Sequence, residues 1–215
     1  HYCINQGRTI VEAGVMSDTH SSEYEETYNL EHDRNMWMTG VRTTTNFNEF
    51  ETGNNGSDYY HFTERLWEGE GNVTRHMVAA IRAYRPDIVI THGGVFGDYD
   101  KPGHKLSGRA GLPAFESAGG AEDRWPDLTR LGLAPWQPKK LYMLASESYP
   151  MTLELSSIAA EPLQGTSGTC LEFGEYVIRN FQSQGVYHAR IGRLSLVRSL
   201  VKVPEKERSV FDGLE

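Results

Sequence analysis

The chain of 215 residues lacks the features that mark several specialised classes of protein. It has two cysteines, Cys3 and Cys170, which are too few for a disulfide framework or a four-cysteine zinc site. It has no apolar run of about 18 residues, the length that a membrane-spanning helix needs. Basic residues are not in excess either, because 21 Lys and Arg stand against 29 Asp and Glu, a formal net charge of −8. Since nucleic-acid binders usually carry a basic stripe, we expect no nucleic acid as a partner.

The start of the chain also lacks something, because the first residue is His1 and not methionine. No charged segment followed by an apolar segment, the pattern of a secretory signal, stands there. We expect either that a leader has been removed or that the chain begins inside a longer protein.

The clearest pattern in the sequence is a helix followed by a buried strand. Apolar residues over 73–84 recur on one helical face, with Asn72 as the expected N-cap. Pro86 is expected to end this helix, because it disfavours helical geometry at the residue before it. The apolar run 88–91 is typical of a central parallel strand covered on both faces. Helix, tight turn and buried strand are half of a βαβ unit, which predicts an α/β fold.

Further elements are expected on both sides of this unit. The sequence predicts strands over 8–16, 41–50, 140–144 and 194–203, and helices over 25–39, 105–118 and 171–182. Pro113 is expected to kink or split its helix. The stretch 121–138 is expected to be a long ordered loop. The length favours a single domain over residues 1–215.

The segment from His92 to His104 carries the residues best suited to chemistry. It follows the strand over 88–91, and ligands of open α/β sheets bind beyond the carboxyl ends of strands. A neutral histidine can bind Zn²⁺, and Asp98 or Asp100 can bind a metal, orient a histidine or act as a base. The alternative is an ordinary solvated loop, because a loop histidine is more often a surface residue.

Other groups of polar residues have simpler explanations. Residues 18–20 (Asp-Thr-His) with Glu23 have metal-ligand side chains, but a solvated turn and a helix cap explain them better. Residues 31–33 (Glu-His-Asp) are expected on an exposed helix face. No serine stands in a Gly-x-Ser-x-Gly setting, and no phosphate-binding loop is present.

Several segments, taken in their order, resemble the PIG-L/LmbE-like zinc deacetylase family over roughly residues 65–214. They are Arg-Ala-Tyr-Arg-Pro-Asp-Ile-Val-Ile-Thr (82–91), the loop ending in His104, Ala114-Phe115-Glu116, Trp-Pro-Asp-Leu (125–128), Pro-Trp-Gln-Pro-Lys-Lys-Leu-Tyr (135–142), Phe-Gln-Ser-Gln-Gly (181–185), Leu-Val-Arg-Ser (196–199) and Phe-Asp-Gly-Leu (211–214). No single motif is decisive, but their order and spacing together are fairly specific.

The resemblance implies a Rossmann-like α/β fold, with a mostly parallel sheet flanked by helices and long ordered loops. It also implies a single zinc ion and hydrolysis of the N-acetyl group of an N-acetylglucosamine-type sugar, so that an amino sugar is the expected partner. His104 matches a zinc ligand of the family, and Tyr99 matches a tyrosine near the substrate carbonyl. Lys101 and Gly103 stand where the family has His and Asp. Lys101 can still donate to an oxyanion.

The main departure is that the chain has no His-Pro-Asp-Asp motif, which supplies two zinc ligands and the general base in the family. We expect this motif and the first strand to lie upstream of residue 1, so that Zn²⁺ binds only if the missing ligands are supplied. The alternatives are a catalytically inactive member that acts as a carbohydrate-binding or structural subunit, and a chain whose motif comes from a partner. The sequence leaves a homo-oligomer open and slightly favours an extracellular or periplasmic location over a cytoplasmic one.

Overall fold

The computed structural model describes residues 1–17, 22–41, 43–50, 57–92, 102–120, 122–144, 150–182, 188 and 192–214. The chain divides into two compact units. Unit 1 consists of His1–Glu51 and Glu154–Gly192, and unit 2 consists of Thr52–Leu153 and Arg193–Glu215. Each unit is therefore built from two separated stretches, and the single domain expected from the sequence stays a prediction. No helix in the described ranges combines the length and the hydropathy that a bilayer span requires.

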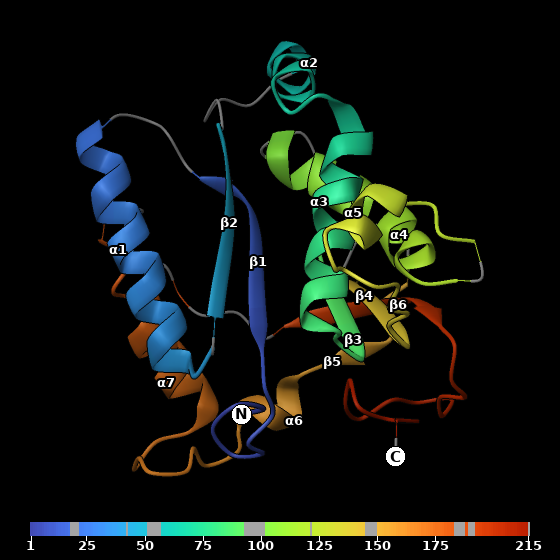
Figure 1. Cartoon of the computed structure of the whole chain (residues 1–215). Coiled ribbons are helices and arrows are strands. Elements are labelled where there is room, and N and C mark those ends of the chain that lie inside the picture. The colour runs from blue at the N-terminus through green and yellow to red at the C-terminus, as the bar shows by residue number, and fades with distance from the viewer. Residues whose placement is uncertain are drawn as a thin grey trace. The chain divides into compact units, whose positions relative to one another are not determined.

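Unit 1 contains a βαβ arrangement near the start of the chain. β1 (Val11–Ser17) and β2 (Thr43–Phe50) pair in parallel, and α1 (Ser22–Thr39) connects them, as Figure 1 shows. Each of the three elements confirms its sequence prediction within a few residues. The second stretch of unit 1 adds the short helix α6 (Ser156–Ala159) and α7 (Cys170–Ile178), which contacts α1.

A capping box starts helix α7, and the sequence analysis missed it. The Thr169 hydroxyl accepts a hydrogen bond from the backbone N–H of Glu172 (3.2 Å), and the Glu172 carboxylate accepts one from the backbone N–H of Thr169 (2.7 Å). The hydrogen bonds from the Thr169 backbone and then its hydroxyl lower the pKa of the Glu172 carboxyl. The helix ends at Ile178, earlier than predicted.

The sheet of unit 2 is mixed. β3 (Ile88–Thr91) pairs in parallel with β4 (Lys140–Leu144), and β6 (Arg193–Ser199) pairs antiparallel with the other edge of β4. The two-residue strand β5 (Leu153–Glu154) follows β6 in the order β3-β4-β6-β5. The expectation of a central β3 is wrong for the described strands, because β3 is the outermost one and the side chain of Ile90 is 50% exposed.

Two helices precede β3, namely α2 (Ser57–Leu66) and α3 (Gly69–Tyr84), and α4 (Pro102–Ala118) follows it. α3 and α4 lie side by side (Figure 1). Two apolar clusters join the helices to each other and to the sheet. Their buried members are Val78, Ile81, Ala114, Ala118 and Leu128 in one, and Phe115, Leu141 and Met143 in the other. Pro113 does not split α4, which continues to Ala118, and the apolar residues Ala114, Phe115 and Ala118 after the proline are buried.

The start of α3 corrects another expectation. The helix begins at Gly69, after Glu68 in the left-handed conformation (φ 57°), so Asn72 lies inside the helix and is not its N-cap. The Asn72 side-chain amide donates instead to the carbonyl of Trp67 (3.2 Å). The end of α3 is as predicted, because Arg85 leaves the helical conformation (φ 51°) directly before the proline.

Buried Arg82 orders the loop after α4. Its side chain is 1% exposed, and it donates to the carbonyls of Ala118 (2.9 Å) and Trp125 (3.2 Å). It also forms an ion pair with Asp123 (2.8 Å), whose pKa is lowered by hydrogen bonds from Thr129 and from this arginine. Over residues 122–138 the prediction of a long ordered loop is confirmed, and this stretch contains the short helix α5 (Pro126–Arg130).

A buried lysine joins β4 to the end of the chain. Lys140 is fully buried, and its ammonium group donates to the Glu207 carboxylate (2.7 Å) and to the carbonyls of Val210 and Asp212 (2.9 Å each). The Tyr142 hydroxyl donates to the same carboxylate oxygen of Glu207 (2.5 Å). All three protons of the ammonium group thus have acceptors, which is what a buried lysine requires.

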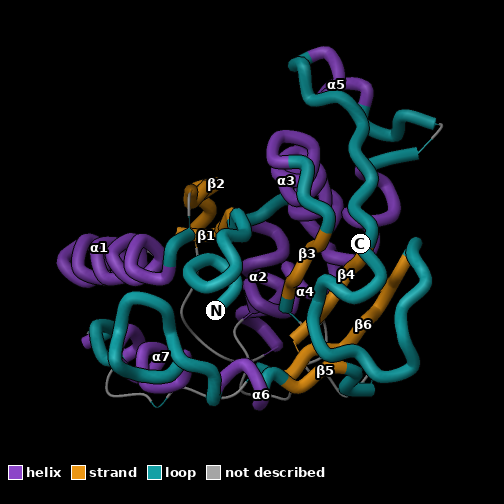
Figure 2. The backbone as a smooth tube through the Cα atoms, turned by 90° about the horizontal axis from the view of Figure 1, so that it is seen from below, coloured by secondary structure: helices purple, strands orange, loops and turns teal. Residues whose placement is uncertain are grey.

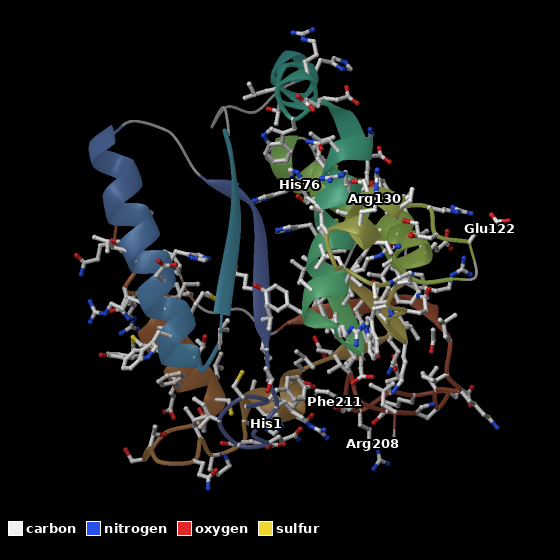
Figure 3. All side chains as sticks on the ribbon, viewed as in Figure 1. His1, His76, Glu122, Arg130, Arg208 and Phe211 are labelled. Atoms are coloured by element: carbon white, nitrogen blue, oxygen red, sulfur yellow. The ribbon has the colours of Figure 1, made fainter. Side chains whose placement is uncertain are left out.

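The segment after β6 returns to β4, as the tube in Figure 2 shows. Figure 3 labels Arg208 and Phe211 on this segment. A tight turn closes it, in which the backbone N–H of Arg208 donates to the Asp212 carboxylate (2.6 Å). Gly213 adopts φ +81°, and a Cβ atom there would lie 2.3 Å from the carbonyl oxygen of Lys202. This position therefore requires glycine.

Candidate functional site

Two histidines meet at the carboxyl end of β3. His92 directly follows the last residue of the strand, and His104 lies in the first turn of α4. Their imidazole rings stack with centroids 4.4 Å apart and an angle of 7° between the ring planes. Both side chains are half-buried. The two ends of the segment that the sequence analysis selected are therefore in contact.

The other predicted site residues of this segment lie outside the described residues. These are Tyr99 and Lys101, together with the acidic alternatives Asp98 and Asp100. Their predicted roles stay predictions, as does zinc ligation by His104.

A close approach of helix to strand holds α4 against β3 next to the two rings. A Cβ atom at Gly111 would lie 2.6 Å from the Cγ2 atom of Thr91 and 3.5 Å from the methyl group of Met143. Because Thr91 immediately precedes His92, this contact also fixes the point at which the chain leaves the sheet. Sequence reasoning did not single out Gly111, although a glycine in a helix interior often marks such a close approach.

The described residues do not fit a zinc site. Zinc takes three or four ligands from histidine, cysteine and carboxylate side chains. Nowhere in the described part of the chain do three such side chains converge. The two stacked histidines cannot both bind one ion, because an imidazole binds a metal in its ring plane and nearly parallel, stacked planes share no position at bonding distance. In this arrangement, at most one of the two rings is a ligand.

The weaker candidates of unit 1 do not form a second site among the described residues. Residues 18–20 lie outside the described ranges, and so does the side chain of Glu23. His32 is not simply on an exposed face, because its Nε2 atom lies 3.1 Å from a carboxylate oxygen of Glu12 on β1. The hydrogen bond with Glu12 is the main cause that raises the pKa of His32, and the exposed Asp33 contributes less.

The chain is similar in sequence to a known deacetylase. No family model matches the chain. A 1D-myo-inositol 2-acetamido-2-deoxy-α-D-glucopyranoside deacetylase from Thermobifida fusca is 29% identical over 108 residues, which are 50% of this chain and 35% of that protein. The match thus spans about a third of the length of that relative.

The fold is also similar to that of solved structures. The N,N'-diacetylchitobiose deacetylase from Pyrococcus horikoshii superposes with a TM-score of 0.61 and 14% identity, covering 84% of this chain and 61% of that chain. The conserved protein TT1542 from Thermus thermophilus superposes with a TM-score of 0.57 and 12% identity, covering 93% of this chain and 86% of that chain. At these identities the structures confirm the α/β fold class. Sequence and fold together confirm the resemblance of this chain to the PIG-L/LmbE-like family.

Proposed function

We propose that the chain is an amide hydrolase that removes the acetyl group of an N-acetylglucosamine-type sugar or conjugate. The structural observation that carries the proposal is the contact between His92 and His104 at the carboxyl end of β3, where α/β folds bind their ligands. The names of two similar proteins point to the substrate class, because both describe deacetylases of acetamido sugars.

The reaction needs a nucleophile and stabilisation of the charge that develops on the amide oxygen. Water adds to the acetyl carbonyl, the carbon–nitrogen bond breaks, and acetate and the free amine of the sugar are released. The proposal assigns the stabilisation of the oxyanion to the hydroxyl of Tyr99 or the ammonium group of Lys101. It takes the base that deprotonates the water from residues outside the described part of the chain.

The proposed enzyme uses a zinc ion, and His104 is one of its ligands. A family that uses zinc for this chemistry supports the choice, and so does the position of His104 in the first turn of α4. Because the described residues supply no further ligand beside it, the remaining ligands of the proposed site come from outside the described ranges.

The proposal is tested by zinc content and acetate release in the same preparations. We expect about one zinc per chain by elemental analysis and acetate release from N,N'-diacetylchitobiose, with both lost in His104→Ala. His61→Ala is the matched control, because the His61 side chain is 66% exposed and lies on α2. A wild-type chain that binds no zinc and releases no acetate overturns the proposal.

Two further variants identify the oxyanion donor. Removal of one such donor typically lowers kcat by about 10²–10³-fold. We therefore expect a loss of this size in either Tyr99→Phe or Lys101→Met, with a small change in KM. If both variants keep the wild-type kcat, neither residue has the proposed role.

The competing function is a carbohydrate-binding or structural subunit without catalysis. The observation that favours it is the single histidine ligand available among the described residues, together with Lys101 and Gly103 in place of the histidine and aspartate of the family. Isothermal titration with N-acetylglucosamine oligomers discriminates the two. Binding of the sugar without zinc and without acetate release supports the subunit, whereas turnover supports the hydrolase.

A further inference from the structure

The predicted role of His104 as a ligand does not explain why the ring of His92 is stacked on it. His92 comes from the end of a strand and His104 from the start of a helix, so two independently anchored elements bring the rings together. The centroid distance of 4.4 Å is larger than the roughly 3.5 Å contact distance between carbon atoms, so the rings are stacked with an offset. Offset stacking is a favourable arrangement for aromatic rings.

Stacking gives the two rings different tasks. A histidine binds a metal or a proton donor through nitrogens that lie in the plane of its ring. Because the two planes are stacked and differ by only 7°, an atom at bonding distance in the plane of one ring does not lie in the plane of the other. If His104 binds a partner through a ring nitrogen, His92 contacts the ring of His104 through its face and does not bind the same partner in its own plane.

Contact with the face of His92 restricts the orientation of the His104 ring, which the backbone of α4 alone does not. The outer side-chain torsion of histidine is broad, so a free ring samples many orientations. Contact with a flat, anchored neighbour narrows that range. His92 is well anchored, because Thr91 pairs with Met143 on β4 and packs against Gly111 on α4.

We propose that His92 is a positioning residue for the proposed deacetylation, with the face of its ring fixing the plane of His104. The inference rests on the proposed function and assigns no direct contact between His92 and the substrate. The proposed role uses the face of the His92 ring and assigns none to its nitrogens, so the proposal predicts that a phenyl ring can take the place of the imidazole. Misplacement of a reacting group by about 1 Å can cost 10²-fold in rate, so the orientation of His104 matters for turnover.

The experiment compares His92→Phe, which keeps a flat ring, with His92→Ala, which removes it. We expect His92→Phe to keep kcat within about threefold of the wild type. We expect His92→Ala to lose about 10–100-fold in kcat, the usual cost of losing a group that orients a ligand, with KM nearly unchanged. His61→Ala again serves as the control.

Two results overturn the inference. Equal losses in His92→Phe and His92→Ala mean that the ring nitrogens matter, and a wild-type kcat in His92→Ala means that the ring has no role. Circular dichroism and thermal unfolding of each variant separate these results from a failure to fold.

A second readout does not depend on activity. In the wild-type protein, the ring protons of His92 and His104 should show a nuclear Overhauser effect, and His92→Ala should shift the His104 ring signals while His92→Phe keeps a ring-current effect. Absence of this contact overturns the inference. A wild-type chain that shows the contact but releases no acetate overturns the proposed function instead.

Discussion

Unit 1 and unit 2 differ in how their helices are joined to their strands. In unit 2, α4 packs on the sheet through Phe115, Leu141 and Met143, which are at most 3% exposed. In unit 1, the described side chains join α1 to β1 through the hydrogen-bonded pair of His32 and Glu12.

Each unit has a fully buried polar side chain, and the two side chains differ in how they are paired. On α1, Trp37 is 79% exposed, while Asn35 is fully buried and its two amide atoms have no hydrogen-bond partner in the described part of the chain. In unit 2, buried Lys140 has an acceptor for each of its three protons. The pairing in unit 2 is not complete either, because the second carboxylate oxygen of Glu207 is buried and has no hydrogen-bond partner in the described part of the chain.

The largest expected effect comes from breaking the buried pair of unit 2. Glu207→Ala leaves the ammonium group of Lys140 buried without its countercharge, and we expect a loss of about 3–5 kcal/mol in the free energy of unfolding, measured with urea. Arg198→Ala is the control, because its ion pair with Glu116 is about half exposed and should contribute less than about 1 kcal/mol. Equal losses in the two variants would contradict the assignment.

A paired substitution sharpens this test. Replacing the buried pair by apolar side chains, as Lys140→Met with Glu207→Leu, removes both charges at once. We expect the double variant to recover part of the stability that Glu207→Ala loses, because apolar replacements of buried ion pairs are often neutral. The recovery is partial because the Tyr142 hydroxyl and the carbonyls of Val210 and Asp212 lose their partners.

The next effect comes from the close approach of α4 to β3. Gly111→Ala puts a Cβ atom 2.6 Å from Thr91, and we expect a loss of about 1–3 kcal/mol from overpacking. Acetate release should fall as well, because Thr91, which the new atom would displace, directly precedes His92. Gly71→Ala, with nothing within 4 Å of the new atom, should be neutral or stabilising by up to about 1 kcal/mol. Thermal unfolding of both variants checks the contrast.

In unit 1, the capping box of α7 should contribute about 1 kcal/mol. Thr169→Ala removes the hydroxyl that accepts from the backbone N–H of Glu172, and a loss of this size is usual for an N-cap. The exposed Ser167 offers the control, since Ser167→Ala should change the free energy of unfolding by less than about 0.5 kcal/mol. A Thr169→Ala variant as stable as the control would show that the cap is dispensable.

The smallest expected effect is a pH dependence from unit 1. The pKa of His32 is raised by its hydrogen bond with Glu12, so the folded chain binds this proton more tightly than the unfolded chain. The stabilisation is complete below the ordinary histidine pKa and is lost as the pH rises through the raised value. Urea unfolding between about pH 5 and 8 should show this slope in the wild type and a flatter one in Glu12→Gln and His32→Gln. A slope unchanged in both variants would place its origin elsewhere.

The spacing of apolar residues and the position of proline predicted the helices and strands near the site well. The helix before Pro86, the strand Ile88–Thr91 and the strand Lys140–Leu144 are all present. They were predictable because their signals are local, namely an apolar face, a proline and a short apolar run. One local signal gave a wrong prediction, because the helix starts at Gly69 and Asn72 is therefore not its N-cap.

The features that sequence reasoning missed depend on residues far apart in the chain. The position of β3 at the edge of the described sheet depends on which strands pair with it, and its apolar sequence is the same at an edge or in the centre. The partners of Lys140 come from the other end of unit 2. His92 and His104 were both in the predicted segment, but their stacking follows from the angle between β3 and α4, which no spacing in the sequence encodes.

The buried lysine has a consequence for the synthesis of the protein. The carboxylate that neutralises Lys140 lies 67 positions later in the chain, and the whole second stretch of unit 1 is made in between. At about 5–20 residues per second, a ribosome leaves this charge without its partner for roughly 3–13 s. β4 therefore emerges with a lysine that must remain hydrated, and its pairing with β6 and with Glu207 must wait until residues 193–207 have been made. The interleaving of the two units makes folding of unit 2 a late event, which exposes its apolar helix faces to chaperones in the meantime.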